Sequence, residues 1–269
     1  MEKRKHKLSA SALSCFLESP KAYYWRYHAR LEPLALSTSN FDHDKICGIL
    51  WADWVDKFYK SVPEADNTKR MLSEWDSQTD GWVGKTTKDK LTEAMKTWAS
   101  LYHERYSPKD GIRNGSEKFV ENERFLGYLD GLSHDGKIIH EVKSTSRAKS
   151  VSEQLWVVQN SLQVKLYAIL TGADGILIEF AWKDLPHDIW RSEMLKISKE
   201  QRTGWEKELN ALADKIYSLG EDENNYPCHP QGCCIVSKGF TSICGYQSLC
   251  CKVIGAEISF KEKSRRVAN

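Results

Sequence analysis

The stretch that decides the fold spans residues 127–146 and reads GYLDGLSHDGKIIHEVKSTS. Its two ends, 127–133 and 137–143, are rich in apolar and β-branched residues, which is typical of strands. The dipeptide Asp135-Gly136 between them favours a tight turn. We therefore expect an antiparallel hairpin here, with a third strand over 117–126 just before it.

This hairpin carries two carboxylates and a lysine. Asp130 ends the first strand, and Glu141 and Lys143 lie two residues apart on the second, so these two side chains share a face. Two close carboxylates attract a hard divalent cation, which polarises a phosphodiester and lowers the pKa of a bound water. A nearby lysine can orient that water or stabilise negative charge. The pattern indicates phosphodiester hydrolysis; a cross-strand ion pair on a solvated face is the alternative.

The neighbouring residues favour the site over the simple ion pair. Ile138, Ile139 and Val142 indicate a strand with substantial burial on both faces, where a charged group usually has a reason to be. A second acid-x-lysine triplet, 135–137, lies in the turn and lacks a carboxylate on a partner strand. The first triplet is therefore the better candidate.

The remaining elements follow from hydrophobic periodicity. Residues 63–87 are polar and are expected to be irregular. Helices are expected over 8–30 (interrupted near Pro20), 46–62, 88–106 and 151–171 and from Ser198 onward, and a strand over 175–182. This order predicts an α/β (α+β) fold in one domain, 1–269, with a helical insertion at 41–115.

Composition restricts the location and the partners. The net charge is only +2, so attraction to phosphate must come from local patches. No apolar run is long enough to span a membrane, and the start lacks the apolar core and cleavage site of a signal peptide. We expect a cytoplasmic protein. Six of the eight cysteines fall within 228–251, a density that suggests metal binding by thiolates in a reducing compartment.

The hairpin motif resembles that of the PD-(D/E)XK nuclease superfamily and, within it, the RecB-like branch that includes many phage exonucleases. The matching residues are Asp130 after a short strand, Glu141 and Lys143 on the next strand, and Gln163 and Tyr167 in the QxxxY element. The resemblance implies a restriction-endonuclease-like core, with a central mixed sheet flanked by helices. It also implies Mg²⁺ or Mn²⁺ on the two acids, and a QxxxY pair that contacts substrate or orients the catalytic groups.

The opening of the chain, LSASALSCFLESPKAYYWRY (8–27), is similar to the first helix of that branch. Family members often carry a metal-binding histidine four residues after the glycine that corresponds to Gly48. Here that position is Ala52. Asp53 or Asp56 could supply a ligand instead, although solvated helix residues are the favoured interpretation of both.

The cysteine-rich segment 226–252 resembles the tail of the iron–sulfur subset of RecB-like nucleases, which includes the CRISPR spacer-acquisition nucleases. The resemblance implies a structural [4Fe–4S] cluster, with zinc as the alternative. The expected ligands are Cys228, Cys234, Cys244 and Cys250, with Cys15 or Cys233 as alternates. The subset also uses an upstream cysteine, at the position of Ser19.

These features predict a metal-dependent DNA nuclease, an exonuclease in recombination, repair or replication, acting on single- or double-stranded DNA. A recombination or replication protein is a candidate partner. The expected DNA contacts are Lys21, Arg26, Arg147 and Lys149. One alternative is a nuclease-like protein that binds DNA or a recombination partner without cutting, which the missing histidine favours. The other is a metal-stabilised interaction module with surface carboxylates.

Overall fold

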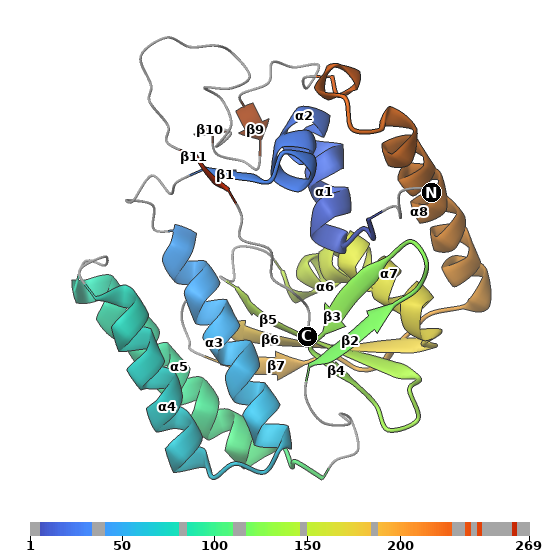
Figure 1. Ribbon diagram of the computed structural model, residues 1–269. Coiled ribbons are helices and arrows are strands. Elements are labelled where there is room, and N and C mark those ends of the chain that lie inside the picture. Colours follow the sequence, from blue (N-terminus) through green and yellow to red (C-terminus); the bar gives the residue numbers. More distant parts are fainter. Residues whose placement is uncertain are drawn as a thin grey trace. The chain divides into compact units, whose positions relative to one another are not determined.

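The computed structural model describes residues 6–33, 41–80, 85–109, 117–145, 150–183, 188–227, 235–237, 241–243 and 260–262. The chain forms two compact units (Figure 1). The terminal unit comprises residues 1–37 and 207–269, and the central unit comprises 38–206. No helix of the described residues is long and apolar enough to cross a bilayer.

The central unit is built on a mixed five-stranded sheet. Its strands are β4 (Gly131–Leu132), β5 (Ile138–Thr145), β6 (Gly175–Trp182), β7 (Ile189–Arg191) and β8 (Leu195–Lys196). The order is β4-β5-β6-β7, with β8 also paired to β6, and only the β5–β6 pair is parallel. All eight residues of β6 are buried, as expected for a strand covered on both faces. The expected mixed sheet flanked by helices is confirmed.

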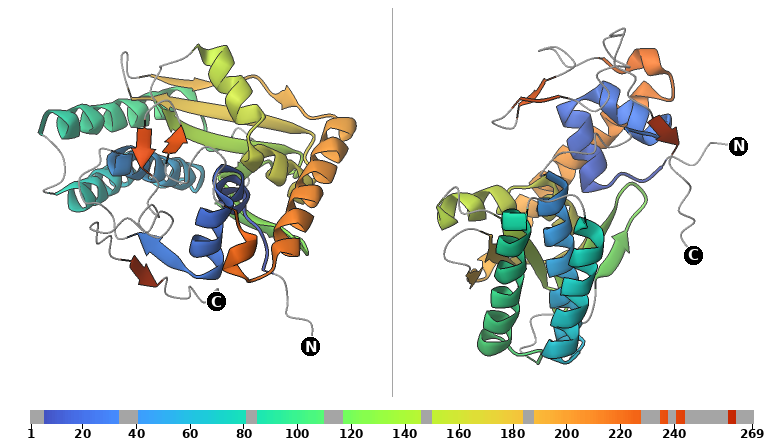
Figure 2. Two further views of the ribbon diagram at one scale, coloured as in Figure 1. Left: turned by 90° about the horizontal axis from the view of Figure 1, so that it is seen from above. Right: turned by 90° about the vertical axis from the view of Figure 1, so that its left-hand side faces the viewer.

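One face of this sheet is covered by α3 (Phe41–Tyr59) and α5 (Lys85–Arg105), and α4 (Glu64–Thr79) packs against these two helices (Figure 2). Their core is aromatic and includes Trp51, Trp54, Trp75, Trp98 and Tyr102. The indole of Trp98 donates a hydrogen bond to the Trp182 carbonyl at the end of β6, at 3.0 Å. These helices fill the region predicted as a helical insertion.

The prediction of an irregular segment over 63–87 was wrong, because α4 occupies most of it. The helix is polar apart from a narrow buried stripe with a spacing of four residues: Asn67, Met71, Trp75 and Thr79. Two members of that stripe are polar, which hid the periodicity. Asn67 donates to the Trp54 carbonyl at 2.8 Å, so its amide is satisfied inside the helical core.

Two hairpins lead into the sheet. β2 (Lys118–Glu121) pairs with β3 (Leu126–Leu129), and β4 pairs with β5. Gly136 adopts a positive φ of 73° in the second turn, as the predicted Asp-Gly turn requires.

The connection from β5 to β6 was expected to be a single helix over 151–171, but it consists of two helices. These are α6 (Val151–Gln159) and α7 (Leu162–Thr171). Ser161 interrupts the helix because its side chain accepts the Val164 amide as a new N-cap.

The terminal unit joins the two ends of the chain. Its elements are α1 (Ala10–Glu18), α2 (Pro20–Tyr23), a π-helical turn (Tyr24–His28), β1 (Leu31–Pro33), most of α8 (Lys199–Leu219), a 3-10 turn (Glu223–Asn225), β9 (Ile235–Ser237), β10 (Thr241–Ile243) and β11 (Phe260–Glu262). β1 pairs with β11, and the Tyr226 hydroxyl lies 2.9 Å from Nε2 of His28. A capping box opens α8: the Ser198 side chain accepts from the Gln201 amide, and the Gln201 side chain accepts from the Ser198 amide.

A buried carboxylate anchors the sheet to the helical layer. Glu179 of β6 pairs with Nε of Arg191, accepts the Tyr102 hydroxyl at 2.7 Å and lies 3.0 Å from Nε2 of His140. Burial alone would raise the pKa of Glu179, but His140 and Arg191 outweigh it and lower the pKa to about 2. The guanidinium of Arg191 also lies 3.6 Å from the ring centroid of Tyr106. This carboxylate is therefore fully compensated.

Removing Arg191 should leave the Glu179 charge buried with too few partners. We expect Arg191→Met to lower the free energy of unfolding by about 3–5 kcal/mol in urea denaturation. Arg105→Met is the control, because its ion pair with Asp188 is about half exposed and should contribute only about 0–1 kcal/mol. Similar small losses in both variants would contradict a structural role for the buried pair.

Candidate active site

Strand β5 separates two environments, because alternate side chains point to opposite faces. Ser144 faces α3, since a Cβ added to Gly48 would lie 3.0 Å from its Oγ. Lys143 points the other way and donates from Nζ to Oε1 of Gln163 on α7, at 3.2 Å. Glu141 shares the face of Lys143 and pairs with its ammonium group. The predicted pair therefore lies on the α7 side of the sheet.

Asp130 lies in the bend between β3 and β4 and is held against β5. Its Oδ2 accepts a hydrogen bond from the backbone amide of Val142, at 2.9 Å. Val142 lies between Glu141 and Lys143, so this bond fixes the Asp130 carboxylate beside the other two charged groups. The hairpin thus brings together the three residues singled out from the sequence.

Glu141 is the most constrained of the three. Its side chain has no exposure, and Lys143 is its only polar partner among the described residues. Burial raises the pKa of Glu141 to about 7; Lys143 opposes this shift and Asp130 adds to it. Burial alone would lower the pKa of Lys143, but the two carboxylates raise it above its usual value. The lysine is therefore a cation held against a buried carboxylate that has no other polar partner among the described residues.

The QxxxY pair extends this cluster to β3. Nε2 of Gln163 donates to the Tyr167 hydroxyl at 3.3 Å, and that hydroxyl donates to the Tyr128 carbonyl at 2.5 Å. Lys143 is thus linked through two side chains to the strand that precedes Asp130.

Sequence reasoning did not identify the part that Gly127 plays in this linkage. A Cβ at this position would lie 2.5 Å from Cε1 of Tyr167, so the tyrosine ring can pack on β3 only because position 127 is glycine. A glycine inside a strand often marks such a close approach, and this was the signal available in the sequence.

The other predicted site residues lie elsewhere. Lys21 and Arg26 belong to the terminal unit, and Lys21 is paired with Glu223 at 3.2 Å. Cys15 is half-buried on α1 beside Ala22 and Trp25. Seven predicted residues lie outside the described ranges: Arg147, Lys149, Cys228, Cys233, Cys234, Cys244 and Cys250.

The position of the expected histidine, Ala52, lies within α3. Asp53 pairs with Arg70, and Asp56 pairs with Lys60 at 2.7 Å. Both aspartates are therefore engaged in ion pairs. Asp53 is partly exposed, whereas Asp56 is buried, so the favoured interpretation of a solvated helix residue was wrong for Asp56. Within the described residues, no group of three or more histidine, cysteine or acidic side chains gathers as a metal site.

The chemistry of Asp130 and Glu141 nevertheless fits a hard cation. Mg²⁺ keeps several waters and is usually held by one or two carboxylates plus substrate phosphates, so two acids are enough. Glu141 offers oxygens that accept no well-directed hydrogen bond from the described residues. A buried carboxylate in that state is suited to binding a cation.

Comparison with known proteins decides the family. The model of the PD-(D/E)XK nuclease superfamily matches residues 7–251. The chain belongs to the PD-(D/E)XK nuclease superfamily. The match includes the hairpin that carries Asp130, Glu141 and Lys143. Membership supports a nuclease, a hydrolase of phosphodiester bonds.

Two solved structures are reported as similar to this chain. A candidate exonuclease from Eubacterium rectale is 11% identical, with 80% of this chain and 82% of that chain covered and a TM-score of 0.48. A phage-related exonuclease from Haemophilus somnus is 15% identical, with 79% and 93% covered and a TM-score of 0.38. No curated protein matches the chain.

The raised pKa of Glu141 predicts a pH-dependent stability. Its pKa is about 7 in the folded chain against 4.5 for the free residue, so between these values the native state holds a proton that the unfolded chain has lost. Stability therefore falls as pH rises through this window. We therefore compare the free energy of unfolding of Glu141→Gln with that of the wild type, by urea denaturation without divalent cations. The difference in favour of the variant should grow by about 3 kcal/mol between about pH 4 and about pH 8.

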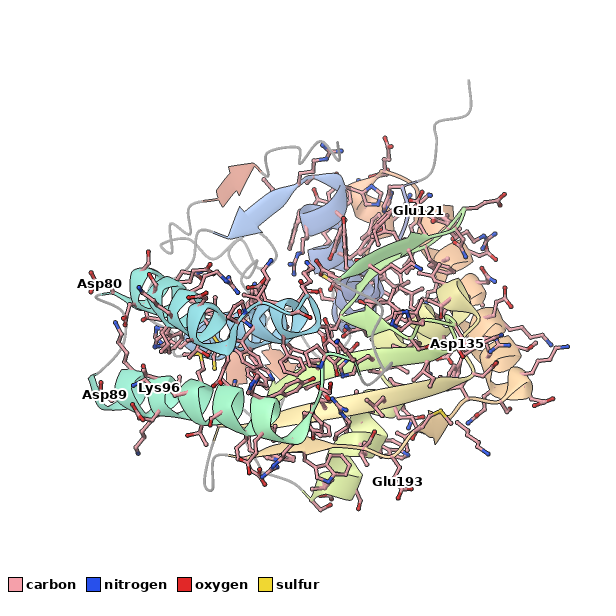
Figure 3. The ribbon with its side chains drawn as sticks, turned by 90° about the horizontal axis from the view of Figure 1, so that it is seen from below. Asp80, Asp89, Lys96, Glu121, Asp135 and Glu193 are labelled. Atoms are coloured by element: carbon pink, nitrogen blue, oxygen red, sulfur yellow. The ribbon has the colours of Figure 1, made fainter. Side chains whose placement is uncertain are left out.

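Glu193→Gln is the matched control, because Glu193 is exposed at the surface (Figure 3). This variant should follow the wild type at every pH. A constant difference between Glu141→Gln and the wild type across the range would show that Glu141 has an ordinary pKa and is not the desolvated group described above.

Proposed function

We propose that this chain is a divalent-metal-dependent deoxyribonuclease, acting as an exonuclease in DNA recombination, repair or replication. The observation that carries the proposal is the fully buried carboxylate of Glu141, with Lys143 paired to it and Asp130 held alongside. A buried acid with so few partners is costly to the fold, and a structural role would be filled better by an apolar residue. A catalytic role explains why this member of a nuclease superfamily keeps such an acid.

Each member of the cluster then has a distinct part. Asp130 and Glu141 would hold Mg²⁺ or Mn²⁺, which when bound polarises the scissile phosphodiester and lowers the pKa of a water. Lys143 supplies a fixed positive charge that orients the attacking water or stabilises the charge that develops on the phosphate. Its raised pKa keeps the ammonium group protonated at neutral pH.

The remaining two residues position the lysine. Gln163 accepts from Lys143 through Oε1 and donates through Nε2 to Tyr167, which fixes the orientation of its amide. The Tyr167 hydroxyl stays protonated because burial raises its pKa, so it can anchor to the Tyr128 carbonyl. Catalysis by the preorganised charge of Lys143 depends on that chain of hydrogen bonds.

We also propose that the cysteine-rich segment 226–252 binds a structural [4Fe–4S] cluster, with zinc as the alternative. The support is the number and density of its cysteines and the resemblance of their spacing to the iron–sulfur subset. Cys15 belongs to the same terminal unit, so an upstream ligand would come from the other end of the chain. The cluster would stabilise this unit by binding only its folded state.

A second candidate function is a nuclease-like protein that binds DNA without cutting. Ala52, at the position where related nucleases often have a metal-binding histidine, favours it. The cluster of Asp130, Glu141 and Lys143 favours cleavage, because a protein that only binds DNA needs no buried acid beside a second carboxylate.

Cleavage of end-labelled linear DNA separates these possibilities. Wild type prepared without oxygen should cut single- or double-stranded DNA with Mn²⁺ or Mg²⁺ and not with EDTA. Asp130→Asn, Glu141→Gln and Lys143→Met should each lower the rate by at least about 100-fold, because each removes one electrostatic contribution to the transition state.

Asp135→Asn is the matched control, since Asp135 begins the second acid-x-lysine triplet and lies exposed in the β4–β5 turn (Figure 3). It should cut at the wild-type rate. Wild type that binds DNA yet never cuts it, with either metal, would support the non-cleaving candidate. Cutting that survives in Glu141→Gln would remove the proposed site.

A further inference from the structure

Most aromatic side chains in the described residues are buried or half-buried, and three are exposed: Phe119, Tyr128 and Trp156. Two of these three form a pair. Phe119 of β2 is the register partner of Tyr128 of β3, and their ring centroids lie 5.1 Å apart. Phe119 is 46% exposed and Tyr128 is 52% exposed. The outer face of this hairpin thus presents two adjacent rings to solvent.

The hairpin does not need these rings for its own packing. Its inner face is formed by Gly127, which lies against Tyr167, and by Leu129, which is fully buried. The rings stand on the opposite face, because successive side chains alternate along a strand. Contiguous apolar surface that the fold leaves in water commonly marks a binding site.

The exposed pair is linked to the candidate active site through the backbone of β3. The Tyr128 carbonyl is the acceptor that ends the chain Lys143–Gln163–Tyr167. Asp130 follows Tyr128 by two residues, in the bend after β3. The Tyr128 ring is therefore carried by the strand that leads directly into one of the two acids proposed to hold the metal.

We propose that the Phe119–Tyr128 pair is a stacking platform for an unpaired nucleobase of the DNA strand to be cut. This inference rests on the proposed DNA nuclease function and names its substrate as single-stranded DNA or a frayed duplex end. Bases in an intact duplex have their faces covered by neighbours, so only an unpaired base can use the rings. Stacking on an aromatic ring contributes about 5- to 150-fold in affinity per base and tolerates any sequence.

The test measures binding and does not depend on cleavage. The full chain carrying Glu141→Gln is titrated with three fluorescein-labelled probes: a short oligothymidylate, an abasic oligonucleotide of the same length, and a blunt duplex. Fluorescence anisotropy gives the Kd of each. Oligothymidylate should bind at least about 10-fold more tightly than the abasic strand, because both carry the same phosphates and only one carries bases.

Two double variants at the same positions complete the design. Phe119→Val with Tyr128→Val keeps strand-forming residues but removes both rings. It should lose the preference for oligothymidylate while it binds the abasic strand and the duplex as before. Phe119→Tyr with Tyr128→Phe exchanges the two residues, keeps both rings and should retain the full preference. Circular dichroism and the Tm verify that each variant is folded.

Equal affinity of the parent protein for oligothymidylate and the abasic strand would overturn the platform, and this comparison needs no ring variant to fold. The platform would also be overturned if the double valine variant kept the parent protein's preference for oligothymidylate over the abasic strand. Either result leaves the nuclease proposal standing if wild type cuts DNA and Glu141→Gln does not. Conversely, if only the double valine variant lost the preference for oligothymidylate, the platform would be established even if the wild type failed to cut DNA.

Discussion

The burial of the Glu141 carboxylate next to Asp130 is the constraint on which this site depends. Desolvation and a neighbouring acid both disfavour its charge, and Lys143 is the only described partner that offsets them. The surrounding structure serves this arrangement: Val142 holds Asp130 through its amide, and the QxxxY pair holds the lysine. A divalent cation between the two acids would relieve their mutual repulsion, which is the physical reason for proposing that they hold one.

The same sheet contains a second buried carboxylate that shows what a structural acid looks like. Glu179, which faces the helical layer, has Arg191, His140 and Tyr102 around it, and its pKa falls to about 2. Glu141 has one partner, and its pKa rises to about 7. The two acids differ in compensation and not in burial. That difference fits a structural role for Glu179 and supports the catalytic role proposed for Glu141.

Local sequence signals predicted much of the fold and most of the candidate site. The Asp-Gly turn and the strand alternation placed Glu141 and Lys143 on one face, because register and period are local properties. Helix α4 was missed because Asn67 and Thr79 in its stripe are polar, and only tertiary contacts satisfy them. The exposure of Tyr128 also could not be predicted, since it depends on the packing of the inner face of the hairpin against α7.

The central claim is that Asp130 and Glu141 together bind a hard divalent cation. Titration of the protein with Mn²⁺, followed by electron paramagnetic resonance of the free ion, tests it directly, and thiolates do not compete because they prefer softer metals. The account predicts Mn²⁺ binding by the wild type at neutral pH that is lost in both Asp130→Asn and Glu141→Gln. Wild type that binds no Mn²⁺ even with single-stranded DNA present, or variants that bind it as the wild type does, would contradict the account.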